Sequence, residues 1–98
     1  MKRAYSGATF SPTFTVTTGG TFASYVTDPH GRKLESSVTE TGGTATLTIA
    51  ADDWHDGSTG YGRIEITRET GGVKSVEVAE RFRVLPGLQV EGASDYSG

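Results

Sequence analysis

The side chains best suited to chemistry gather between residues 51 and 61. This segment is acidic and holds the only tryptophan; its candidate groups are Asp52, Asp53, Trp54, His55 and Asp56. A calcium loop places oxygen ligands at alternating positions before a glycine, and Asp52, Asp56 and Gly57 could serve. Trp54, however, takes the middle ligand position. We therefore favour a connecting loop whose aspartates accept hydrogen bonds from backbone N–H groups, and we expect no metal.

A second hypothesis is that the two histidines take part in catalysis. His30 and His55 could act as general acids or bases. The sequence places neither beside a nucleophile such as Ser58 together with a third group to orient the ring, and the chain has no cysteine thiol. We expect no catalytic residue and no cofactor, and hence a protein that is not an enzyme.

Composition limits the partners as well. The 98 residues suffice for one domain, and their formal net charge is −3. Nucleic-acid-binding domains typically carry a basic patch, so we expect no nucleic-acid partner. Lys2 and Arg3 are not followed by the apolar stretch of a signal peptide, and no segment is apolar enough to cross a bilayer. We expect a complete chain that is made in a cytoplasm and has no membrane partner.

The elements that must position these residues are β-strands. Thr-Gly-Gly occurs at residues 18–20, 41–43 and 70–72, each time between runs of alternating apolar and polar residues. Glycine adopts the positive φ that tight hairpin turns need. The pattern predicts strands at residues 9–16, 21–27, 33–40, 44–50, 61–68 and 73–85. Pro12 lacks an N–H, so the first strand should lie at an edge or contain a break.

Alternation assigns one face of each strand to the core. The predicted inward residues include Ala45, Leu47, Ile49, Ile64, Ile66, Val76, Val78, Phe82 and Val84. Outward charges on the last two strands should pair across the hairpin; they are Arg63, Glu65, Lys74, Glu77, Arg81 and Arg83. We divide the chain into an N-terminal arm (residues 1–8), a β-sandwich domain (residues 9–86) and a flexible C-terminal tail (residues 87–98).

The order of these hairpins, with a corner at Asp56, Gly57 and Tyr61, resembles that of immunoglobulin-like domains. In that family a tyrosine follows an Asp/Gly corner and opens a strand that pairs with the last one. The resemblance covers about residues 9–85. It implies an all-β fold, an antiparallel immunoglobulin-like β-sandwich of six to seven strands, with a partly closed β-barrel as the alternative.

Aromatic and apolar residues outside the alternating core pattern are candidates for contact with other molecules. We favour Trp54 as a cap on one end of the core over an exposed platform. Tyr25 has the parity opposite to that of the apolar residues in its strand, so it should lie either on the outer face or against a neighbour. Tyr5, Leu88 and Val90 lie in the terminal segments, where they could contact another subunit.

Residues 54–66, together with Arg-Phe-Arg-Val at residues 81–84, look like small immunoglobulin-like modules of tailed-bacteriophage baseplate, fibre and head proteins. That resemblance implies a non-enzymatic structural component of a phage or phage-like particle, located in the virion. Its partners would be other virion proteins or further copies of itself. Two alternatives stay open. One is a carbohydrate- or host-surface-binding module that uses residues 52–61, with Trp54 and His55 in contact; the other is a small phage-encoded inhibitor of a host protein.

Overall fold

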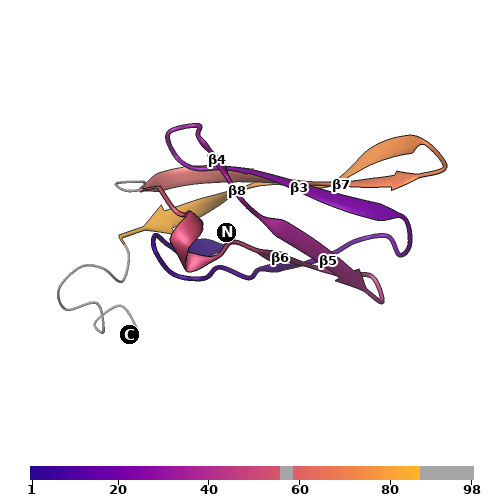
Figure 1. The fold of residues 1–98 in the computed structure, drawn as a ribbon, viewed down its shortest axis with the longest axis horizontal. Coiled ribbons are helices and arrows are strands. Elements are labelled where there is room, and N and C mark those ends of the chain that lie inside the picture. The colour runs from indigo at the N-terminus through magenta and orange to yellow at the C-terminus, as the bar shows by residue number, and fades with distance from the viewer. Residues whose placement is uncertain (56–58, 87–98) are drawn as a thin grey trace.

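Two β-sheets lie face to face in this protein (Figure 1), for which the computed structural model describes residues 1–55 and 59–86. The five-stranded sheet has the order β1-β8-β7-β3-β4 and the three-stranded sheet the order β2-β6-β5. A single turn of 3-10 helix, η1 (Ala51–Asp53), follows β6. The strands are β1 (Arg3–Tyr5), β2 (Thr13–Thr15), β3 (Thr21–Thr27), β4 (Lys33–Leu34), β5 (Ser37–Thr41), β6 (Thr44–Thr48), β7 (Gly60–Thr70) and β8 (Val73–Leu85). The predicted β-sandwich is confirmed, and the sheets do not close into a barrel.

Two of the three Thr-Gly-Gly copies form the predicted hairpin turns. Gly42 and Gly43 join β5 to β6 with φ of 58° and 87°, and Gly71 and Gly72 join β7 to β8 with φ of 59° and 82°. Positive φ at both central residues is typical of the type I′ turn, whose twist matches that of the strands. The first copy, at residues 18–20, instead joins β2 to β3, which lie in different sheets. The chain is therefore not a simple series of hairpins.

The core forms where the apolar faces of the two sheets meet. Its largest fully buried side chains are Val26, Leu34, Leu47, Ile49, Ile64, Ile66, Phe82 and Val84. Phe82 lies among aromatic neighbours, with its ring centroid 5.3 Å from that of Phe10 and 6.4 Å from that of Trp54. The inward faces predicted for the strands at residues 44–50 and 61–68 are confirmed. Among the residues described, no helix is long and apolar enough to span a membrane.

Two predicted strands are interrupted. The strand expected at residues 33–40 divides into β4, which pairs with β3, and β5, which pairs with β6 in the other sheet. Ser36 lies at this crossing, with its Oγ 2.8 Å from that of Ser24. The strand expected at residues 9–16 shortens to β2, and Phe10 forms a separate bridge with Ile49. The break falls at Pro12, which cannot donate a backbone hydrogen bond.

The N-terminal segment is part of the sandwich, which corrects its prediction as an arm outside the core. β1 pairs in parallel with the end of β8, so that Arg3 lies opposite Arg83. The Arg83 N–H donates to the Lys2 carbonyl oxygen (2.9 Å), and Ala4 is only 1% exposed. Ala4 and Ser6 are too small to stand out as an apolar alternation, which is why the sequence pattern missed this strand. With β1 added and the strand at 33–40 divided, the count is eight strands in place of six to seven.

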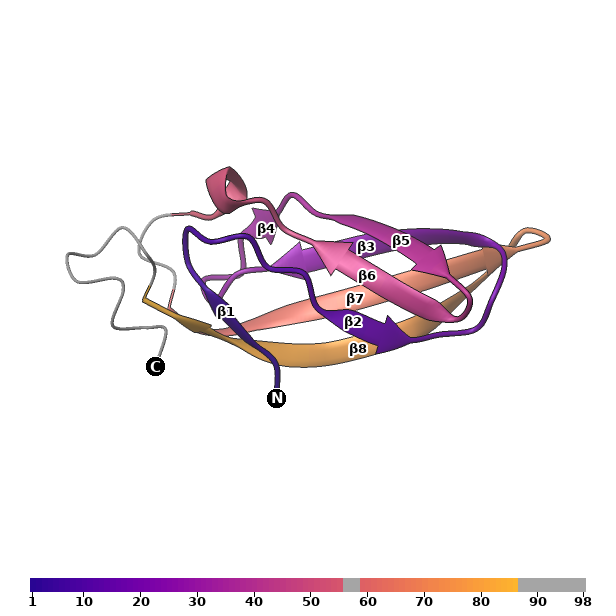
Figure 2. The ribbon, with the colours of Figure 1, turned by 90° about the horizontal axis from the view of Figure 1, so that it is seen from below.

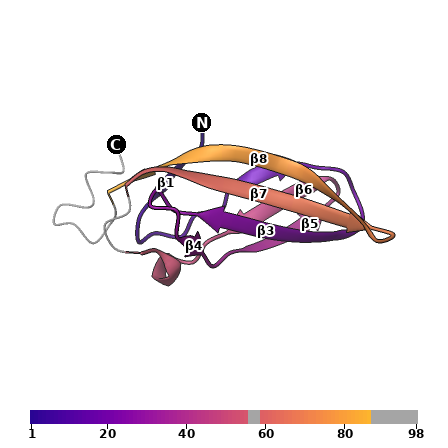
Figure 3. The ribbon, with the colours of Figure 1, turned by 90° about the horizontal axis from the view of Figure 1, so that it is seen from above.

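A β-bulge divides the β7–β8 hairpin. Ile66 lies opposite Val78 but Thr67 lies opposite Val76, so Glu77 is an extra residue in β8. An extra residue reverses which face the following side chains occupy. Val76, predicted to point inward, is accordingly 58% exposed, near the end of the hairpin that extends beyond the three-stranded sheet (Figures 1 and 3).

Candidate protein-docking site

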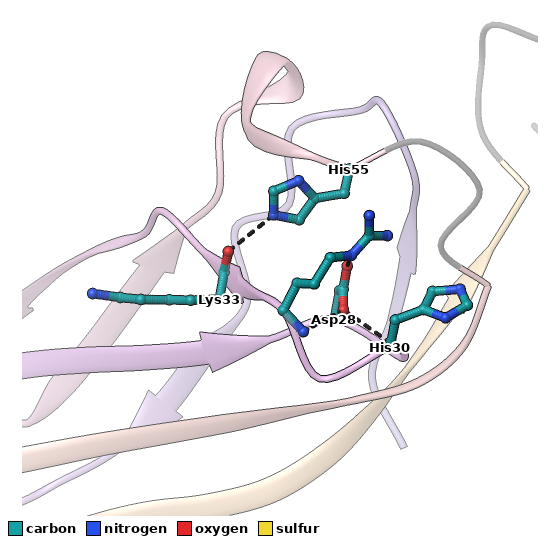
Figure 4. A network of polar contacts seen from close by, with 5 residues as sticks. Asp28, His30, Lys33 and His55 are labelled. Atoms are coloured by element: carbon teal, nitrogen blue, oxygen red, sulfur yellow. Dashed lines mark hydrogen bonds and ion pairs between the residues drawn. The ribbon is translucent and has the colours of Figure 1, made fainter.

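The polar residues near His55 hold two loops together. The buried Asp28 carboxylate accepts hydrogen bonds from the backbone N–H groups of His30 (2.9 Å) and Arg32 (2.8 Å) and forms an ion pair with the Arg32 guanidinium (2.9 Å). His55 lies across from this turn, where its Nε2–H donates to the Lys33 carbonyl oxygen at 3.0 Å (Figure 4). These bonds connect the turn after β3 to the segment after η1, so the network holds the two loops together.

Trp54 closes one end of the core, the position favoured from the sequence. Its side chain is 8% exposed and its Nε1–H donates to the Ala8 carbonyl oxygen at 2.8 Å. The indole is therefore not an exposed platform for a sugar. Among the residues described, no three His, Asp or Glu side chains gather as a metal site would require. Asp56, Gly57 and Ser58 lie outside the described residues, as do Leu88 and Val90.

The three tyrosines singled out from the sequence occupy different positions. Tyr25 is 52% exposed on the outer face of the five-stranded sheet, with the Lys33 Nζ 5.7 Å from its ring centroid. Tyr5 is half-buried within β1. Tyr61 was expected at a tyrosine corner, but it is 49% exposed and belongs to the outer face instead. These three tyrosines do not lie together in one site.

Arginines gather on that outer face around Tyr61. Strand pairing places Arg83 between Tyr61 and Arg3, and it places Arg63 opposite Arg81. The Arg81 and Arg83 guanidinium carbons lie 5.4 and 5.6 Å from the centroid of the Tyr61 ring. We call these five residues the arginine surface. All five are exposed.

Within residues 1–55 and 59–86, no acidic side chain forms an ion pair with the four arginines of the arginine surface. The predicted pairing of Arg63 and Glu65 with opposite charges across the hairpin is wrong, because Arg63 faces Arg81 and Glu65 faces Ala79. Like charges directly opposite one another on a sheet repel. An anionic partner would therefore be favoured here.

Beside the arginine surface, the edges of the two sheets leave a groove. β2 runs along β8 on this side of the sandwich, and β1 covers only the far end of β8 (Figure 2). The groove has a volume of about 420 Å³ and is lined by Lys2, Thr13, Phe14, Thr15, Glu77, Val78, Ala79 and Glu80. We call it the β2–β8 groove. Next to it, Met1, Lys2, Glu80 and Arg81 surround a second hollow.

Backbone hydrogen-bonding groups are unpaired along both sides of the groove. The Arg83 N–H points toward β1, and strand alternation turns the backbone groups of Arg81 and Ala79 the same way. On either side of β2, the Pro12 carbonyl oxygen accepts from the Leu47 N–H and the Val16 N–H donates to the Gly43 carbonyl oxygen. The backbone groups of Thr13 and Thr15 therefore face away from β6. In the part of the chain that the structure describes, none of these outward groups has a hydrogen-bond partner. Such an edge is a template for another strand.

Two side chains mark the ends of the groove. At one end the Thr17 N–H donates to Glu77 Oε1 (2.7 Å), which holds the pKa of that carboxyl below its usual range. At the other end the Lys2 Nζ lies 4.7 Å from the centroid of the Phe14 ring. The groove is thus an open strand position with a mostly polar surface, because Phe14 and Val78 beneath it are largely buried in the core.

No protein-family model and no curated protein sequence matches this chain. Among solved structures, the crystal structure of the Lin-41 filamin domain is similar to it. The TM-score is 0.60 at 14% sequence identity, over 88% of this chain and 85% of that chain. The similarity supports the immunoglobulin-like β-sandwich and, at this identity, shows the fold alone.

The sequence predicted an edge position or a break for the strand that contains Pro12, but it did not predict the arginine surface or the groove between β2 and β8. The arginines carried a usable signal, since Arg63, Arg81 and Arg83 were assigned outward by alternation. Their proximity depends on the bulge at Glu77, which sets Arg81 opposite Arg63. The groove depends on where β1 ends along β8, which follows from tertiary packing and leaves no pattern in the sequence.

Proposed function

We propose that this protein is a non-enzymatic structural component of a phage or phage-like particle, and that it acts through protein–protein contacts at the β2–β8 groove. The observation that carries the proposal is the unpaired edge of β8 at Ala79 and Arg81, beside the unpaired edge of β2. Globular proteins usually cover or shorten such edges, so an open one favours strand addition by a partner. Its partners are other virion proteins or further copies of itself.

The particle assignment is supported by the resemblance of residues 54–66 and 81–84 to small phage modules. The filamin-like fold is compatible with it, because the same fold serves many functions. The carbohydrate-binding alternative has less support, since Trp54 is buried and His55 is bonded to a backbone carbonyl. The inhibitor alternative supposes an acidic surface that mimics nucleic acid, and the exposed arginine surface has the opposite charge.

Site-specific photo-crosslinking in cells that produce the particle tests this function. A photoreactive residue at Ala79 should crosslink to a particle protein or to another copy, and the product should be present in purified particles. The matched control is Thr39, an exposed residue on β5 in the opposite sheet. Equal crosslinking at both positions, or a protein absent from purified particles, would refute the proposal.

A further inference from the structure

We propose that the β2–β8 groove binds residues 88–91 of another copy of this chain as an added β-strand. This inference rests on the proposed function and specifies its partner. The acceptor is the unpaired edge of β8, and the donor is the segment that follows β8 after Pro86 and Gly87.

The donor has the side-chain pattern of a β-strand. Leu88 and Val90 alternate with Gln89 and Glu91, which is the period-two pattern of a strand with one apolar face. Residues level with one another on neighbouring strands share a face of the sheet. A donor strand with its apolar residues on the same face as Val78 therefore turns Glu91 toward the arginine surface.

One register satisfies both faces. If the donor runs parallel to β8, as β1 does, Leu88 lies level with Val78 and Glu91 lies level with Arg81. Leu88 then lies beside Val78, and the Glu91 carboxylate lies beside Arg81, which is itself opposite Arg63. The donor takes the strand position that β1 leaves open.

Charge favours the same occupant. Residues 87–98 carry two carboxylates, Glu91 and Asp95, and no lysine or arginine. The arginine surface holds four guanidinium groups without an ion pair among the described residues. Arginine and carboxylate form charge-assisted, bidentate hydrogen bonds, so the donor supplies the anions that this surface lacks.

The chain's own segment cannot reach this position, so the donor belongs to another copy. Val78 lies seven residues before Leu85, which is about 23 Å along a strand. The three Cα steps from Leu85 to Leu88 span at most about 11 Å. β1 also fills the strand position next to Leu85. Strand donation between copies produces a closed dimer or ring, or an open chain of subunits.

A charge exchange between donor and acceptor tests the inference with the full-length protein. Arg81→Glu alone and Glu91→Arg alone each place like charges together, and each should weaken self-association at least about fivefold in sedimentation velocity. In an equimolar mixture, both cross-contacts pair opposite charges, so the mixture should assemble as the parent does. Thermal melting checks that each variant is folded; Lys74→Glu, on the projecting part of the hairpin, is the matched surface control.

The outcomes separate this inference from the proposed function. A parent that stays monomeric at every concentration overturns strand donation, as do single variants that assemble like the parent or a mixture that fails to recover. If Arg81→Glu instead abolishes binding of a short DNA duplex while self-association is unchanged, the arginine surface serves nucleic acid and the inference is wrong. Crosslinking from Ala79 to a different particle protein would leave the proposed function intact in each case.

Discussion

Gly62→Ala should destabilise the protein even though the backbone there needs no glycine. Gly62 lies on β7 opposite Phe82, and its φ is not in the left-handed region. A Cβ at this position would lie 2.6 Å from Phe82 Cε1, 2.7 Å from Phe82 Cζ and 2.6 Å from the Thr27 carbonyl oxygen. The carbonyl belongs to β3 and the ring is packed between Phe10 and Trp54, so neither can withdraw easily.

Two opposing terms set the size of this effect. Overpacking a core costs about 1–3 kcal/mol, and clashes with both a ring and a backbone atom place Gly62→Ala near the upper value. The Gly→Ala change also restricts the unfolded chain, which raises the free energy of unfolding by about 0.5–1 kcal/mol. The net loss is about 2 kcal/mol in the free energy of unfolding. For a domain of this size that lowers Tm by about 8–16 °C.

Thermal unfolding followed by circular dichroism, with urea unfolding followed by Trp54 fluorescence, measures the loss. Gly42→Ala is the comparison, because its Cβ would meet nothing within 4 Å and only its φ of 58° costs energy, about 1 kcal/mol. Phe82→Leu should relieve part of the clash, so the double variant should be less destabilised than the sum of the single ones by about 1 kcal/mol. A Tm for Gly62→Ala within a few degrees of the parent, or strict additivity, would refute the packing argument.

Three further predictions concern stability. Ile66→Asp should abolish cooperative unfolding because a carboxylate would be buried between the sheets, whereas Val76→Asp, on the exposed side of the bulge, should melt close to the parent. Trp54→Phe should cost about 1–3 kcal/mol in urea unfolding, because the partly buried carbonyl oxygen of Ala8 loses its donor. Glu77→Gln should lower stability at neutral pH but not in strong acid. The hydrogen bond from the Thr17 N–H lowers the pKa of Glu77. The stabilisation by Glu77 is therefore present above the usual pKa of a glutamate and is lost as the pH falls through the lowered pKa.

Three results would contradict these predictions. A cooperative parent-like melt of Ile66→Asp would mean that the β7 faces are assigned wrongly. If Trp54→Phe left urea unfolding unchanged, the indole hydrogen bond would not contribute to the free energy of unfolding. A pH-independent effect of Glu77→Gln in melts across the acid range would show that the Thr17 bond does not depend on the carboxylate charge.

The sequence predicted the parts of the fold that follow from local chemistry. Strict alternation identified the inward faces of Leu47 and Ile66, and paired glycines identified two hairpin turns. The strand at residues 33–40 was predicted as one unit because a change of sheet at Ser36 leaves the alternation of Leu34 and Val38 intact. Local pattern does not say which sheet a strand joins.

The candidate docking site was less predictable because it depends on long-range register. With Gly71 and Gly72 as the turn and no bulge, Arg63 would lie opposite Glu80, and the expected attraction between opposite charges would follow. The bulge at Glu77 moves Arg81 into that position. Strand alternation in the sequence does not reveal the added residue, because Val76 and Val78 are two residues apart, as apolar residues on one face of a regular strand would be.

The bulge also leaves the part of β8 between the turn and Glu77 without a role in core packing. Beyond Glu77 the side chains of β8 are exposed back to the turn, and a Cβ at Gly71 or Gly72 would meet no atom within 4 Å. A short epitope inserted between these glycines should therefore be tolerated, while the same insertion between Gly42 and Gly43 would disturb β6 and its buried Ala45. Antibody decoration of that epitope would reveal the orientation of each subunit by electron microscopy.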